Sequence, residues 1–129
     1  MWSRDTDWRQ GSLLSADQFA AIKNLVPCIC DFIMAISHDC DIACDNATEP
    51  NIEFVAVKVF PASAGNGNFM YSKNPRKLHL PYEDKVFELS ANQKFSIPKS
   101  KLIQIVPSTY VWDDKSKAIF QTWLAIRYQ

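Results

Sequence analysis

The sequence predicts a single α+β domain over residues 1–129, built on a small bent, mainly antiparallel β-sheet or partly open barrel. With 129 residues, 47% of them hydrophobic and 22% charged, the chain has the size and composition of one globular domain. Short strand-like runs follow one another closely, which is typical of small barrels and bent sheets. A short N-terminal helix and a longer C-terminal helix are expected to flank this sheet.

The first elements are a bend and a short helix. Gly11 permits the bend, and Ser15 and Gln18 fit a capping box, in which each side chain bonds the backbone of the other. Pro27 ends the helix that follows. Three apolar side chains share its face: Phe19, Ile22 and Val26.

Residues 28–37 are expected to form the central strand, because the run is long, almost uncharged and partly β-branched. Strand alternation divides its side chains between two faces. One face carries Cys28, Cys30, Phe32, Met34 and Ile36, continuing to His38 and Cys40. The other carries Ile29, Asp31, Ile33, Ala35 and Ser37, continuing to Asp39 and Asp41.

Further short strands and one helix complete the expected fold. Strands are predicted at residues 52–60, 69–71, 77–81, 86–89, 94–98 and 101–106, with turns or loops at 45–51, 61–68 and 90–93. Asp113 or Asp114 is expected to cap a last helix that runs to Tyr128. Its apolar face packs on the sheet or meets a partner.

The charge distribution limits the classes of function. The formal net charge is zero, which excludes the long-range field of a dedicated nucleic-acid or membrane-surface binder. Six acids and no lysine or arginine lie within residues 31–53, giving an acidic edge: Asp31, Asp39, Asp41, Asp45, Glu49 and Glu53. Eight bases within residues 58–101 give a basic edge: Lys58, Lys73, Arg76, Lys77, Lys85, Lys94, Lys99 and Lys101.

No signal-peptide pattern opens the sequence, and no apolar run reaches membrane-spanning length. We therefore expect a cytoplasmic protein whose four cysteines are thiols or metal ligands rather than disulfides. His38, Cys40 and Cys44, with Cys28, Cys30 and His79, offer ligands for a structural zinc ion, but their spacing is unlike paired zinc knuckles. Buried cysteines that pack as small hydrophobic side chains are the favoured alternative, and the cofactor stays open.

Two enzymatic interpretations use the segment from Ser37 to Asp41. In the first, Cys40 is a nucleophile with His38 or His79 as its base and Asp39 or Asp41 as the orienting carboxylate. In the second, acids of this edge bind magnesium or calcium, as in nucleases. The candidate ligands are Asp39, Asp41, Asp45, Glu49 and Glu53. A solvated acidic loop is the alternative to the second.

The most basic segment suggests contact with phosphate or nucleic acid through four side chains: Lys73, Arg76, Lys77 and His79. The alternative is a solvated basic edge that protects a strand from aggregation.

Four blocks of sequence occur in order: Ser37-His38-Asp39-Cys40-Asp41, Glu49-Pro50, Asn74-Pro75-Arg76 and Trp123-Leu124-Ala125. On these blocks the chain resembles an uncharacterised group of bacterial and phage-type proteins. A second likeness is to MazF-like toxin barrels, through Gln10-Gly11 before a strand and an apolar strand ending at Ile36-Ser37. This second likeness implies a barrel rather than ribonuclease activity.

The sequence thus favours a small non-catalytic interaction protein of a bacterial defence, toxin-antitoxin or phage counter-defence system. Its expected partner is a protein or nucleoprotein complex, with nucleic acid at the basic edge, self-association through the C-terminal helix and no membrane contact. The alternative is a metal-dependent nuclease or Cys/His hydrolase with four candidate catalytic residues: His38, Asp39, Cys40 and Asp41. A structural zinc module is the third hypothesis.

Overall fold

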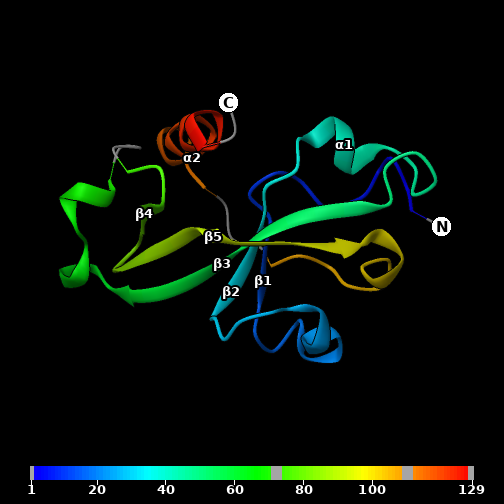
Figure 1. The fold of residues 1–129 in the computed structure, drawn as a ribbon, viewed down its shortest axis with the longest axis horizontal. Helices are drawn as coiled ribbons and strands as arrows, with labels where there is room; N and C mark the ends of the chain where they lie inside the picture. Colours follow the sequence, from blue (N-terminus) through cyan, green and yellow to red (C-terminus); the bar gives the residue numbers. More distant parts are fainter. Residues whose placement is uncertain (1, 71–73, 109–111, 128–129) are drawn as a thin grey trace.

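The computed structural model describes residues 2–70, 74–108 and 112–127. In these residues five antiparallel strands form one open sheet of order β1-β2-β3-β5-β4 (Figure 1). The strands are β1 (Leu13–Ser15), β2 (Phe32–Ala35), β3 (Asn51–Pro61), β4 (Lys77–Tyr82) and β5 (Lys85–Pro98). The expected α+β class and antiparallel sheet are confirmed. In the described residues the sheet is open, with β1 and β4 at its two edges.

The two long strands, β3 and β5, form the centre of the sheet. Strand β3 pairs with β2 along one edge and with β5 along the other. The register with β5 is interrupted because Val55 pairs with Lys94 while Ala56 pairs with Ser90. Residues 91–93 therefore form a bulge that bends one continuous strand. The predicted turn at 90–93 between two separate strands is wrong, because β3 pairs on both sides of the bulge.

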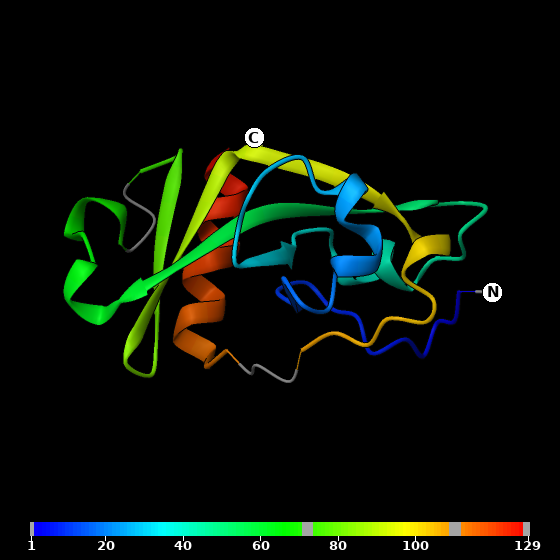
Figure 2. The same cartoon turned by 90° about the horizontal axis from the view of Figure 1, so that it is seen from below.

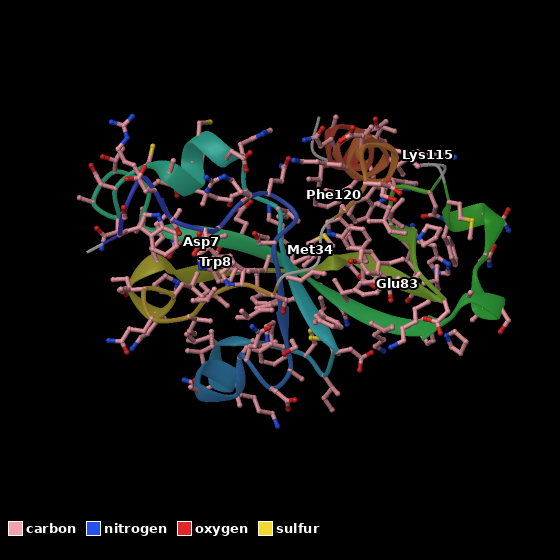
Figure 3. The ribbon with its side chains drawn as sticks, turned by 180° about the vertical axis from the view of Figure 1, so that it is seen from behind. Asp7, Trp8, Met34, Glu83, Lys115 and Phe120 are labelled. Carbon is pink, nitrogen blue, oxygen red and sulfur yellow. The ribbon has the colours of Figure 1, made fainter. Side chains whose placement is uncertain are left out.

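Both faces of the sheet are covered. Apolar side chains that point to either face of the strands are therefore buried. Helix α2 (Asp114–Arg127) packs on one face through Phe120, Trp123 and Leu124. The opposite face is covered by the N-terminal segment, the 3₁₀ helix η1 (Ala20–Leu25) and the residues after the 3₁₀ helix η4 (Lys99–Lys101). Figure 3 shows Trp8 and Phe120 on either side of Met34, which lies where the strands cross.

The N-terminal prediction is partly confirmed. The capping box forms, because the Ser15 backbone N–H donates to Gln18 Oε1 at 2.9 Å and the Gln18 N–H donates to Ser15 Oγ at 3.3 Å. The predicted face is buried: Phe19, Ile22 and Val26. The helix is a 3₁₀ helix with non-helical dihedrals at Ile22, not an α-helix. Such turns are common where a segment is too short to propagate an α-helix.

Three strand predictions are wrong. Strand β2 spans only Phe32–Ala35, because the chain bends at Cys28 before it and continues into the helix α1 (Asp39–Ala43) after it. No strand begins at Phe69, which is the last residue of the 3₁₀ helix η3 (Gly67–Phe69). Another 3₁₀ helix, η2 (Ala62–Ala64), precedes η3. Tyr71, also in the predicted strand, lies outside the described residues. Within the predicted strand at 101–106, Lys101 ends η4, residues 102–104 form a turn and residues 105–106 have no regular structure, because Leu102 packs into the core instead of pairing.

The C-terminal helix is confirmed within the described residues. Asp113 caps α2, since its Oδ1 accepts a hydrogen bond of 2.7 Å from the Ser116 N–H. Trp123 is buried against the sheet, and its Nε1 donates to the carbonyl of Asn74 at 2.8 Å. Tyr128 lies outside the described residues. None of the described helices is long and apolar enough to cross a membrane.

Candidate functional site

A cleft of about 600 Å³ is lined by residues of α1 and α2, on the face of the sheet that α2 covers. Both helices lie above the sheet in Figure 1. The floor of the cleft comes from β3 and β5, and its walls come from the segment joining β2 to α1 and from the C-terminal half of α2. The polar residues that line it are Gln10, Ser37, His38, Asp41, Glu49, Asn51, Glu53, Lys94, Ser96 and Gln121. The apolar ones are Ile36, Leu124 and Ala125.

The end of β2 directs Ser37 and His38 toward this cleft. The Ile36 N–H donates to the Glu53 carbonyl at 2.8 Å, and Ser37 Oγ accepts from the Glu53 N–H at 2.9 Å, so pairing with β3 ends here. His38 is the last extended residue and occupies the N-cap position of α1. From Asp39 onward the chain has helical periodicity.

The predicted assignment of residues 38–41 to two alternating strand faces is wrong, because residues 39–43 form the helix α1. His38 and Asp41, three residues apart, both line the cleft. Asp39 instead accepts a hydrogen bond of 2.7 Å from the Gln10 N–H and tethers the N-terminal segment. Cys40 is exposed and does not line the cleft. Of the four candidate catalytic residues, the structure therefore brings two together in the cleft.

The buried Lys99 holds α1 in place and was not singled out from the sequence. Its Nζ donates to the carbonyls of Asp41 at 2.7 Å and Cys44 at 2.8 Å, and it lies 5.7 Å from the centroid of the Trp2 ring. Trp2 Nε1 donates to the Ile42 carbonyl at 2.6 Å. Burial lowers the pKa of Lys99, while Cys44 and neighbouring carboxylates oppose this shift. A lysine after a strand carries no sequence signal for burial.

The acidic edge separates into two groups. Three acids satisfy backbone N–H groups: Asp31 accepts from Val59, Asp39 from Gln10, and Asp45 from Ala47 and Thr48. The hydrogen bond from the Thr48 N–H is the main reason that the pKa of Asp45 lies below its usual value. The other three acids line the cleft: Asp41, Glu49 and Glu53.

The cleft therefore has an excess of negative charge. Its three carboxylates face one lysine, Lys94, whose Nζ lies 3.5 Å from Glu53 Oε1. Neutral amide and hydroxyl groups of Asn51, Ser96 and Gln121 add donors and acceptors. Leu124 and Ile36 provide an apolar wall. This combination suits a cationic group on an aliphatic stem.

The predicted phosphate-binding residues do not form one exposed patch. His79 is only 4% exposed; its Nδ1 accepts from the Asn66 N–H at 3.1 Å and its Nε2 lies 2.9 Å from Glu88 Oε2. Lys77 Nζ lies 3.5 Å from the same carboxylate, and Arg76 is exposed. Lys73 lies outside the described residues. His79 thus fixes the loop containing η2 and η3 to the sheet and is inaccessible to phosphate.

The two histidines and the cysteines that were candidate zinc ligands do not gather at one site. His79 lies on β4, at the opposite end of the long axis from α1 with His38 and Cys40 (Figures 1 and 2). Over the part of the chain that the structure describes, no three His, Cys, Asp or Glu side chains are placed to hold a metal ion. Comparison with known proteins finds no matching family model and no matching curated protein.

Proposed function

We propose that the protein is a non-catalytic interaction module whose acidic cleft binds a basic segment of a protein partner. The observation that carries this proposal is the cleft of about 600 Å³ with three carboxylates and one lysine. A cavity of this size accepts one or two long side chains with part of their backbone. Guanidinium and ammonium groups are the natural counterparts of clustered carboxylates.

The cleft residues have distinct roles in this proposal. Asp41 and Glu49 provide charge, while Glu53 exchanges its contact with Lys94 for one with the partner's cation. Leu124 of α2 packs against the aliphatic stem of the incoming side chain. Because α1 and α2 form opposite walls, both helices contribute to recognition.

The setting of the interaction is also part of the proposal. We propose a bacterial defence or phage counter-defence system as this setting, in keeping with the bacterial and phage-type proteins that the sequence blocks resemble. The nuclease or Cys/His hydrolase alternative has less support. Cys40, the expected nucleophile, does not line the cleft that contains His38, and His79 is buried against Glu88.

The test is the affinity of a fluorescently labelled arginine-rich octapeptide, measured by anisotropy at several salt concentrations. We expect the double variant Asp41→Asn, Glu49→Gln to bind about tenfold more weakly, since each partly exposed ion pair contributes up to about 1 kcal/mol. The matched control, Glu83→Gln with Asp84→Asn, removes the same charge at the β4–β5 turn and should change affinity less than twofold. Circular dichroism confirms that both variants fold.

An equal loss of affinity in both double variants would show general charge attraction and contradict the proposal. Absence of binding at low salt would do the same. In parallel, the protein is incubated with labelled RNA and DNA in the presence of magnesium, manganese or zinc. Cleavage that disappears in the Asp41→Asn variant would establish an enzyme instead of an interaction module.

A further inference from the structure

The floor of the acidic cleft carries its positive charge toward one end. Side chains at alternate positions of a strand point to the same face of a sheet. Strands β3 and β5 give the floor four such side chains: Asn51, Glu53, Lys94 and Ser96. The strand register pairs Glu53 with Ser96, and Val55 with Lys94. Lys94 therefore lies one row beyond Glu53, in the direction away from Asn51.

The negative charge extends toward the other end of the floor. Glu49 also lines the cleft and lies two residues before Asn51, whose row is about 14 Å from the row of Lys94 at about 3.4 Å per strand residue. Asp41 lies at this end too, because Lys99 donates from its N–H to the Pro50 carbonyl and from its Nζ to the Asp41 carbonyl. Figure 1 shows α1 above the first part of β3. The cleft thus has an acidic end and a basic end.

We propose that the basic segment bound in this cleft is the C-terminal end of a partner polypeptide, with arginine as its last residue. This inference rests on the acidic-cleft function proposed above. The α-carboxylate of the arginine binds Lys94, and its guanidinium group binds Asp41 and Glu49. An arginine within a chain offers no carboxylate, so it matches only the acidic end.

The basic end can hold a carboxylate through two neighbouring side chains. Lys94 and Ser96 are two residues apart on β5 and both line the cleft. An ammonium group has three donors, so Lys94 can contact the incoming carboxylate and Glu53 together, and its Nζ already lies 3.5 Å from Glu53 Oε1. The Ser96 hydroxyl supplies a further donor for the second carboxylate oxygen. Leu124 of α2 packs against the aliphatic stem of the arginine.

The test compares two labelled octapeptides that differ only at the C-terminus. Both end in arginine, with alanine and serine elsewhere and the fluorophore at the N-terminus, and one has a free carboxylate where the other has an amide. Affinity is measured by anisotropy at low salt. We expect the free carboxylate to bind about threefold to fivefold more tightly, as one partly exposed ion pair allows. General attraction to an acidic surface would favour the amide, which has one negative charge fewer.

Two variants locate the group that recognises the carboxylate. Lys94→Met retains an apolar stem but removes the ammonium group, and it should abolish the preference for the free carboxylate. Lys58→Met is the matched control, because Lys58 is exposed on β3 and does not line the cleft. This control should keep the preference within twofold of the unmodified protein. Circular dichroism confirms that both variants fold.

The outcomes separate this inference from the function on which it rests. Equal affinity for the two peptides, or tighter binding of the amide, would overturn the inference. The acidic-cleft function would still stand if Asp41→Asn with Glu49→Gln weakened binding of both peptides. A preference that Lys94→Met leaves unchanged would also overturn the inference. Absence of binding by either peptide would contradict the acidic-cleft function itself, and the inference with it.

Discussion

Lys99 shows how one residue fixes the shape of the candidate site. The carbonyls at the C-terminal end of a helix lack intrahelical partners and carry partial negative charge. In α1 the carbonyls of Asp41 and Cys44 both accept from Lys99 Nζ, which is fully buried. The lysine thereby satisfies the helix end and keeps the side chains of α1 in the cleft wall.

Replacing Lys99 by methionine should reduce the free energy of unfolding by about 2–4 kcal/mol, because two buried carbonyls lose their donor. The measurement is urea denaturation followed by circular dichroism. Lys101→Met, in the same 3₁₀ helix but exposed, is the matched control and should change stability by less than about 0.5 kcal/mol. Similar losses in both variants would contradict a specific role for Lys99.

At the level of elements, α2 owes its start to a single capping residue. Asp113 accepts a hydrogen bond from the Ser116 N–H, and this bond is the main reason that its pKa lies below the usual value of 3.8. Since the folded state favours the carboxylate, its stabilisation is complete above the ordinary pKa. It is lost as pH falls through the lower pKa of the folded state.

Asp113→Ala should therefore fray the first turn of α2, increasing hydrogen exchange at the Ser116 amide about fivefold at neutral pH. In the unmodified protein the same amide should lose protection as the solution is acidified below the folded-state pKa of Asp113. Asp114→Ala is the control, because Asp114 is acidic and lies in the same turn. Equal exchange in the two variants would show that Asp113 does not cap the helix.

The segment from residue 28 to residue 41 shows which features of an element could be predicted. Its apolar alternation correctly separates Ile33 and Ala35 from Met34 and Ile36, which pack on opposite faces of the sheet. Periodicity does not show where pairing ends, because that depends on the partner strand. After pairing with β3 stops at Ser37, the chain enters the helix α1. Side chains three residues apart, such as His38 and Asp41, then lie on the same side, instead of side chains two residues apart.

At the scale of the whole molecule, stability depends on covering both faces of one sheet. Trp123 lies at the centre of the α2 face and is 0% exposed, among side chains from β2, β3, β4 and β5. The same helix supplies Gln121, Leu124 and Ala125 to the cleft. Docking of α2 therefore serves both the core and the candidate site.

Trp123→Ala should lower the free energy of unfolding by about 3–5 kcal/mol through lost burial and the cavity that remains. It should also weaken peptide binding in the acidic cleft. Ile126→Ala on the same helix removes a side chain of a residue that is 46% exposed and should cost less than about 1 kcal/mol. A small effect of Trp123→Ala in urea denaturation would contradict a central role for α2.

Sequence alone was enough to predict the α+β class, the capping box at Ser15, the C-terminal helix with a cap at Asp113 or Asp114, and an acidic segment. These features depend on local hydrogen bonds and periodicity, which neighbouring residues specify. The tertiary structure decided that three acids satisfy backbone N–H groups while Asp41, Glu49 and Glu53 share a cleft, and that Lys99 is buried. It also placed His79 far from Cys40. These outcomes depend on strand register and on contacts between distant segments, which residue type and spacing do not encode.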